Sequence, residues 1–314
     1  MDISVIIPLF NEEENVEPLY ERLSEVLGRL GKSYEIIFVD DGSTDGTSSL
    51  LEELQAGDDN VIVLFMRRNF GQTAAFTAGF DEARGDVIVT MDGDMQNDPA
   101  DIPKLLEHME EYELVSGWRK NRQDVFLTRK LPSMAANWLI SRITGVKLHD
   151  YGCSLKAYRK DVVKALRLYG DMHRFIPAIA NWYGVRVTEV EVDHHPRLRG
   201  KSKYGLSRVT KVILDLLTVR FLQSFSTKPI QFFGPIGLGL GFLGFLISLY
   251  LTGQKILFGA SIGNRPLLLL GVLLIIIGIQ LVGMGLLGEM LVRIYHESQR
   301  KPVYVLKKKI GARS

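Results

Sequence analysis

Asp92 and Asp94 are the residues whose type and spacing point most directly to chemistry. One glycine separates them, and they follow the apolar run DVIVTM over residues 86–91. Two carboxylates at the end of a strand can bind a divalent cation and, through it, a pyrophosphate. A solvated acidic turn is the alternative, because this short pattern is weak by itself. The pair predicts a site for Mg²⁺ or Mn²⁺.

A second acidic loop, VDDGSTD, covers residues 39–45 and also follows an apolar run. Taken alone, it is compatible with a turn and a helix cap, since Ser, Thr and Asp all cap helices well. Bare carboxylates repel each other and repel a phosphate. Two acidic loops at one site therefore favour a metal between them, together with hydrogen-bond donors from a base or a ribose.

The elements that must position these loops alternate along the chain. Asn11 and Glu14 have the spacing of a capping box and predict a helix start after the first strand. We expect strands over 3–7, 34–39, 61–66 and 86–91, and helices from 11, from 44, over 72–84 and over 99–111. This order predicts an α/β fold with a mostly parallel sheet, helices on both faces, and ligands beyond the carboxyl ends of the strands. The first turn, PLFNEEEN, lacks the glycine loop of dinucleotide-binding enzymes, which argues against an enzyme that uses a nicotinamide or flavin cofactor.

Two apolar segments, 232–251 and 266–288, carry no charged side chain. Each reaches the roughly 20 residues that a helix needs to cross a bilayer. The alternative, a pair of buried core helices, would normally show a polar face, and neither segment has one. We therefore expect two transmembrane helices.

Basic residues are frequent before the first span and after the second, whereas the connector 252–265 has only Lys255 and Arg265. The flanking residues are Lys201, Lys203, Arg208, Lys211, Arg220 and Lys228 before the first span and Arg293, Arg300, Lys301 and Lys307 to Lys309 after the second. The positive-inside rule then predicts a protein of the plasma (inner) membrane, with both termini and the large N-terminal domain in the cytoplasm. The single cysteine, Cys153, fits a reducing compartment.

Residues 128–143 and 208–226 resemble amphipathic helices with basic polar faces, which tend to lie in the headgroup plane of a membrane. An ordinary helix packed on the sheet is the alternative. We divide the chain accordingly into a cytoplasmic domain (1–207), an interfacial helix (208–228), two transmembrane helices (230–289) and a basic cytoplasmic tail (290–314).

Several motifs together resemble those of family 2 glycosyltransferases with a GT-A (Rossmann-like) fold. They are IIPLFNEEENV, VDDGSTDGT, NFGQTAAFTAGF and MDGDMQNDP. Further along, HDYGCSLKAYR, HRFIPAIAN, GKSKYG and GMGLLGEMLVRIY resemble the polyisoprenyl-phosphate branch of that family. This branch includes dolichyl-phosphate mannose synthases, prophage-type bactoprenol glucosyl transferases and the undecaprenyl-phosphate aminoarabinose transferase. The resemblance covers nearly the whole chain but does not identify the sugar.

The resemblance implies a role for each matching residue. The nucleotide pocket would use Pro8, Asn11, Glu12, Asp40, Asp41 and Asp92; the metal would be held by Asp92, Asp94 and Gln96. The acceptor phosphate would be bound by Arg119, Arg129, Ser133, Arg197, Arg199, Ser202 and Lys203. Basic side chains near a bilayer suit a lipid phosphate, although a charged run is often only a lipid-facing patch.

Asp150 matches a position where related transferases keep a carboxylate close to the acceptor. A phosphate nucleophile is already ionised at neutral pH, so it needs no strong general base. Asp150 is therefore expected to position the acceptor or to act as a weak base, with a structural role for its loop as the alternative. Catalysis would rest on Asp92, Asp94 and Asp150.

The implied reaction is the inverting transfer of a sugar from a nucleotide-sugar, favouring a UDP-sugar, to undecaprenyl or a similar polyisoprenyl phosphate. GDP-mannose is the alternative donor, and a lipid-linked sugar translocator or scaffold is the non-enzymatic alternative. A polymerising synthase is disfavoured because the chain lacks QxxRW. The partners would be the donor, the lipid acceptor and the membrane, with no nucleic acid. Glycines in both spans favour close helix contacts, and the resemblance implies a homo-oligomer, a tetramer in many relatives.

Overall fold

The structure is a computed structural model, and it describes residues 1–120, 137, 140–142, 144–166, 168, 172–196, 230–259, 261, 266–298 and 303–311. The chain divides into two compact units, Met1–Leu217 with Pro302–Ser314, and Thr218–Lys301. Of the two segments predicted to be interfacial helices, 208–226 lies outside the described residues. Within 128–143, only 137 and 140–142 are described, and these are helical.

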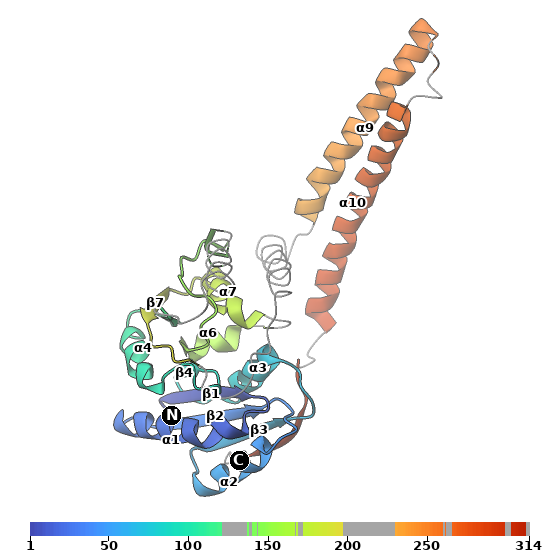
Figure 1. Ribbon diagram of the computed structural model, residues 1–314. Coiled ribbons are helices and arrows are strands. Elements are labelled where there is room, and N and C mark those ends of the chain that lie inside the picture. Colours follow the sequence, from blue (N-terminus) through green and yellow to red (C-terminus); the bar gives the residue numbers. More distant parts are fainter. Residues whose placement is uncertain are drawn as a thin grey trace. The chain divides into compact units, whose positions relative to one another are not determined.

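One sheet forms the framework of the first unit (Figure 1). Its strands are β1 (Ile3–Leu9), β2 (Tyr34–Asp40), β3 (Val61–Met66), β4 (Val87–Thr90), β5 (Leu114–Trp118), β6 (Lys156–Arg159), β7 (Val187–Glu191) and β8 (Leu306–Ile310). Their order across the sheet is β7-β5-β6-β4-β1-β2-β3-β8. β6 and β8 run antiparallel to their neighbours, and the other described pairings are parallel. The predicted mostly parallel α/β sheet is confirmed.

Helices cover both faces of this sheet, as the sequence predicts. They are α1 (Glu13–Arg29), α2 (Thr47–Gly57), α3 (Gln72–Glu82), α4 (Ile102–His108), α6 (Lys160–Ala165) and α7 (Ile176–Trp182), with the 3₁₀ turns η1 (Pro99–Asp101) and η3 (Met172–Phe175). Leu19 and Leu23 of α1 belong to the same buried cluster as Ile7 of β1. On the opposite face, a Cβ on Gly79 of α3 would lie 2.3 Å from Ile6, so α3 packs closely there.

Two predicted helix boundaries differ from the structure. The expected capping box does not form: Asn11 has a φ of 53°, and no side-chain hydrogen bond caps α1. Asn11 Oδ1 instead accepts a hydrogen bond from Thr44 N at 2.8 Å, because the neighbouring loop lies within reach. The segment 99–111 starts as a 3₁₀ turn at Pro99, where Asp98 accepts from Ala100 N, and its α-helix ends at His108.

The sequence predicts only a basic tail after the second span, whereas the structure has the strand β8 there. It pairs antiparallel with β3, with Val63 opposite Ile310 and Phe65 opposite Lys308. A Cβ on Gly311 would lie 2.2 Å from Val61 O, and Gly311 has a φ of 83°. Charged lysines on an edge strand are a common device against edge-to-edge aggregation. The segment Leu306–Ile310 after the second span therefore adds an edge strand to the same sheet that contains β1.

The second unit contains α9 (Ile230–Phe258) and α10 (Pro266–Ser298). Phe232–Phe258 and Pro266–Gly288 are long and apolar enough to cross a membrane, as predicted, and little of either is buried within the protein. Glycines bring the helices together: a Cβ on Gly278 would lie 2.5 Å from Gly237 O, and one on Gly244 would lie 2.5 Å from Gly271 O. A Cβ on Gly283, by contrast, would meet nothing within 4 Å.

Candidate active site

The acidic loops lie at the carboxyl ends of the central parallel strands β1, β2 and β4. Asp40 ends β2, in register with Leu9 of β1, and Asp92 follows β4 by two residues. Because these strands are neighbours, their loops meet at one edge of the sheet. Gly93 allows this close approach, since a Cβ there would lie 2.2 Å from Leu9 Cδ2. Pro8, on β1, pairs with Val39 beside it.

The loop after β1 is tied to the loop after β2. Asn11 N donates to Ser43 Oγ and Glu12 N donates to Thr47 Oγ1, both at 3.0 Å. Glu12 Oε2 accepts from Asn15 Nδ2 at 2.7 Å. The structure thus brings Pro8, Asn11 and Glu12 together with the acidic loop at Asp40, as their assignment to one pocket requires.

Asp40 and Asp41 are buried and bonded in different ways. Asp40 accepts from Ser43 N at 2.9 Å and from Ser48 Oγ at 2.5 Å. Asp41 accepts from the amides of Phe70 and Gly71 at 2.7 and 2.9 Å. Burial raises the pKa of Asp41, although these two amide donors oppose the shift. Asp41 therefore fixes the loop before α3 against the end of β2.

Asp92 and Asp94 lie in the loop after β4, as predicted. Asp92 Oδ1 accepts from Gln72 Nε2 at 2.6 Å, and Asp94 Oδ1 accepts from Gln96 N at 3.2 Å. Burial, followed by the charge of Asp94, raises the pKa of Asp92 to about 6. The Asp94 carboxylate is thus close enough to destabilise the charge of Asp92, and a bound cation would offset this repulsion.

This donor set fits a hydrated divalent cation that a diphosphate also coordinates. Among the described residues, no group of three or more His, Cys, Asp and Glu side chains is placed to enclose a metal. Mg²⁺ is usually bound through one or two carboxylates plus substrate phosphates and water, so two aspartates suffice. Gln96 lies in the same loop, with its backbone directed to Asp94.

Arg119 and Asp150, which were assigned separate roles, form one ion pair. Arg119 Nε donates to Asp150 Oδ2 at 2.7 Å, and Arg119 Nη2 donates to Asp150 Oδ1 at 3.0 Å. Burial disfavours the charged guanidinium, but the carboxylate of Asp150 outweighs that effect and raises the pKa of Arg119. Asp150 therefore orients Arg119 through two hydrogen bonds, and Arg119 keeps further N–H donors for an anion.

Sequence reasoning missed four side chains around these loops: Gln72, Asn97, Ser154 and Lys156. Lys156 is 2% exposed, and its Nζ donates to the carbonyls of Cys153 and Tyr151. Burial lowers its pKa. The only available signal was a single cation in the apolar context of SLKAY. The other three are polar residues of ordinary type whose partners are distant in sequence.

Six of the residues assigned to acceptor binding lie outside the described residues. These are Arg129, Ser133, Arg197, Arg199, Ser202 and Lys203. Within the acceptor set, the structure therefore describes Arg119 alone.

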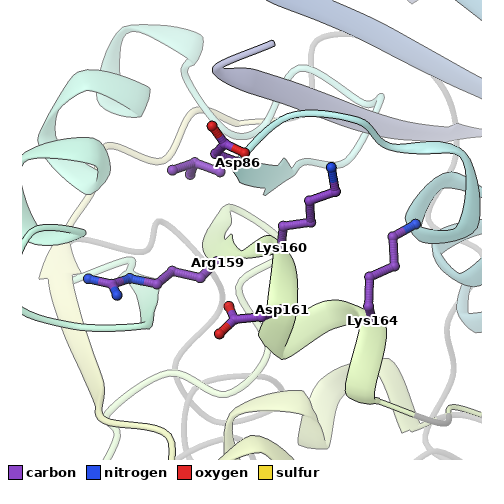
Figure 2. Close-up of a pocket in the computed structure, with 6 residues that line it drawn as sticks. Asp86, Arg159, Lys160, Asp161 and Lys164 are labelled. Carbon is purple, nitrogen blue, oxygen red and sulfur yellow. The ribbon is translucent and has the colours of Figure 1, made fainter.

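A cavity of about 610 Å³ lies elsewhere on the first unit (Figure 2), lined by Asp86, Val87, Arg159, Lys160, Asp161 and Lys164. Val87 begins β4, so the cavity is at the amino ends of the parallel strands, opposite the acidic loops. Lys164 Nζ donates to Phe80 O at 2.5 Å and Asp81 O at 2.9 Å, at the carboxyl end of α3. Lysines commonly bind the last carbonyls of a helix in this way. This arrangement is explained by helix capping.

Solved structures share the fold of the first unit. Glucosyl-3-phosphoglycerate synthase from Mycobacterium tuberculosis, in complex with phosphoglyceric acid, matches with a TM-score of 0.53 and 19% identity over 71% of this chain and 79% of that one. The same enzyme in complex with Mn²⁺, uridine diphosphate and phosphoglyceric acid matches with a TM-score of 0.53 and 20% identity, over 70% of this chain and 78% of that one. At this identity the likeness establishes a GT-A type of fold.

Sequence relatives extend over almost the whole chain. A dodecaprenyl-phosphate galacturonate synthase of Rhizobium johnstonii is 48% identical over 98% of this chain and 92% of its own length. An undecaprenyl-phosphate 4-deoxy-4-formamido-L-arabinose transferase of Yersinia pestis is 40% identical over 99% of this chain and 94% of its own length. Residues 4–167 match the family described as glycosyl transferase family 2. The chain is therefore a glycosyltransferase that belongs to family 2.

Proposed function

We propose that this enzyme transfers a sugar from a nucleotide-sugar to a polyprenyl phosphate, inverting the anomeric carbon. The observation that carries the proposal is the meeting of Asp40 and Asp41 with Asp92 and Asp94 at one edge of the sheet. The two relatives, which are named as polyprenyl-phosphate sugar transferases and match nearly end to end, support the lipid acceptor.

The nucleoside of the donor is placed by the loops after β1 and β2, which Asn11, Ser43 and Thr44 tie together. Asp92 and Asp94 would hold Mg²⁺ or Mn²⁺, which would neutralise charge on the departing nucleoside diphosphate. The acceptor phosphate is drawn to Arg119, whose guanidinium Asp150 holds in a fixed plane. An oxygen of the lipid phosphate then forms a bond to the anomeric carbon as the bond to the diphosphate breaks.

Asp150 acts in this scheme as a positioning residue. Both of its oxygens already accept hydrogen bonds from Arg119, and Oδ1 also accepts from Gly152 N at 3.0 Å. A phosphate nucleophile carries its own negative charge near neutral pH, so no proton must be removed. This favours the positioning role over that of a general base.

The membrane arrangement follows from connectivity. β8 pairs with β3, so the chain before α9 and the chain after α10 belong to one folded unit. Two membrane crossings return the chain to the side on which it started. We place that side in the cytoplasm, because basic residues precede the first span and follow the second.

The proposal is tested by incubating the purified protein with undecaprenyl phosphate and a panel of radiolabelled donors. UDP-galacturonic acid heads the panel because of the galacturonate synthase relative, followed by other UDP-sugars and GDP-mannose. The expected result is a lipid-extractable product from a UDP-sugar that disappears with EDTA and returns with Mg²⁺ or Mn²⁺. Product from GDP-mannose alone would overturn the donor assignment, and EDTA-resistant transfer would overturn the metal.

A further inference from the structure

Asn97 joins three parts of the site that are distant in sequence. It lies in the loop 91–98, which carries Asp92 and Asp94, and it is 3% exposed. Its side chain reaches the loop 150–155, which carries Asp150, and its backbone forms a bridge with His194, which lies in residues 192–195, here called the strap. Residues 197–203, which follow the strap closely in the sequence, include residues that the family resemblance assigns to the acceptor phosphate.

The side-chain contacts centre on Ser154. Asn97 Nδ2 donates to Ser154 Oγ at 2.8 Å, and the same oxygen accepts from Asp92 N at 3.2 Å. On the other side of the amide, Cys153 Sγ donates to Asn97 Oδ1 at 3.7 Å. The hydroxyl of Ser154 therefore connects the amide of Asn97 to the backbone of a proposed metal ligand.

The backbone contacts hold the other side of the loop. Asn97 forms an antiparallel bridge with His194, and His195 N donates to Gln96 O at 2.9 Å. Between these restraints and Asp94, Met95 has a φ of 60°. A non-glycine residue in this left-handed region persists only where its surroundings enforce it. The restraints from Ser154 and the strap supply that enforcement.

From this geometry we propose that Asn97 is a positioning residue that sets the separation and direction of the Asp92 and Asp94 carboxylates through Ser154 and the strap. The inference rests on the proposed metal role of those two aspartates. An amide suits the task because it holds a donor group (NH₂) and an acceptor oxygen in fixed geometry, and each of the two groups makes a bond here. Alanine at this position would leave the Ser154 hydroxyl and the Cys153 thiol without these contacts.

The test measures Mn²⁺ affinity of the full-length protein in detergent with saturating UDP, by electron paramagnetic resonance of free Mn²⁺. Asn97→Ala and Ser154→Ala are each expected to weaken Mn²⁺ binding by about tenfold, the lower end of the usual effect of losing an outer-shell partner. The double variant is expected to be no weaker than either single variant, because both remove the same hydrogen bond. Activity should recover at high Mn²⁺, which a general loss of structure would not allow.

Ser4→Ala provides the matched control. Ser4 is a buried serine that donates to Glu35 Oε1 at 2.5 Å and accepts from Gly85 N at 2.8 Å, at the opposite edge of the sheet. Its removal should lower the melting temperature and leave Mn²⁺ affinity unchanged. If Asn97→Ala does not fold, Ser154→Ala decides the matter alone.

Two results would overturn the inference. Wild-type Mn²⁺ affinity in the folded Asn97→Ala or Ser154→Ala variants would show that the hydrogen bond does not position the carboxylates. Full additivity in the double variant would show that the two residues act separately. No Mn²⁺ binding by the wild type is a different result: it would remove the proposed metal site itself.

Discussion

At the scale of single residues, the carboxylates of the site differ in how their negative charge is compensated. Asp150 is matched by the guanidinium of Arg119, and Asp41 by two backbone amides. Asp92 accepts a hydrogen bond from the neutral amide of Gln72. The charged group with the largest effect on its pKa is the like-charged Asp94. The electrostatic cost is therefore concentrated at the acidic pair, where a bound cation would relieve it.

Replacement of Asp94 by asparagine should separate catalysis from folding. Asp94→Asn keeps the shape of the side chain but removes one negative charge, so we expect transfer to fall by at least about 10²-fold. The melting temperature and detergent extraction should stay close to those of the wild type. Asp86→Asn, at the amino end of β4, is the matched control and should keep its activity. Wild-type turnover of Asp94→Asn would remove the role assigned to it.

The raised pKa of Asp92 gives a pH dependence with a defined sign. The folded protein holds a proton on Asp92 up to about pH 6, whereas the ordinary value is 3.8. Without metal, this group's contribution to the free energy of unfolding is present below pH 3.8 and is lost as the pH rises to about 6. Metal binding must displace that proton, so Mn²⁺ affinity should rise as the pH passes through about 6.

Mn²⁺ titrations in the presence of UDP, at pH values below and above about 6, test whether the affinity rises with pH. Asp94→Asn should shift the metal-free stability transition to lower pH, because it removes the charge that helps to raise the pKa of Asp92. Mn²⁺ affinity in the wild type that does not change with pH would contradict the assignment of Asp92 as a ligand.

At the scale of elements, glycine determines which faces meet. In the sheet unit, Gly79 lets α3 approach Ile6 of β1. In the helical unit, Gly237 and Gly244 of α9 face Gly278 and Gly271 of α10 at backbone contact distance. Small residues at such a crossing allow packing and weak hydrogen bonds that larger side chains exclude. These contacts are intramolecular, so the glycine content that favoured oligomerisation in the sequence is partly explained within one chain.

Two glycine-to-alanine variants should differ in their effect on the stability of the pair of helices. Gly278→Ala places a Cβ 2.5 Å from Gly237 O and should destabilise the hairpin of α9 and α10 by about 1–3 kcal/mol. Gly239→Ala meets nothing within 4 Å and should be neutral or slightly stabilising, since alanine is the better helix former. Thermal unfolding in detergent, followed by limited proteolysis, measures both. Equal effects would indicate that Gly278 does not limit the helix separation.

At the scale of the whole molecule, the chain leaves the sheet unit once and returns to it once. The pairing of β8 with β3 means that the spans are inserted between two parts of one fold. An even number of crossings is required for this connectivity. If both apolar helices cross the membrane, as proposed above, the sheet and the three lysines of β8 are expected on one side and the connector after α9 on the other.

Cysteine labelling tests this arrangement with a low background, because the single native cysteine, Cys153, is buried. Ser261→Cys, in the connector, should react with a membrane-impermeant maleimide on intact cells. Ser33→Cys, exposed beside β1 and β2, should react only after lysis. Labelling of Ser33→Cys on intact cells would reverse the orientation, and labelling of both would contradict the hairpin.

The sequence by itself determined the order of strands and helices over about the first 111 residues, the two apolar spans and the position of the acidic loops at strand ends. These properties depend on local periodicity and on short motifs, and Asp40, Asp92 and Asp94 were found in this way. Tertiary structure alone decided the ion pair of Arg119 with Asp150, the hydrogen bond from Asn97 to Ser154 and the pairing of β8 with β3. Each of these joins residues at least 31 positions apart, and partners at such separations are selected by chain folding and burial rather than by local sequence.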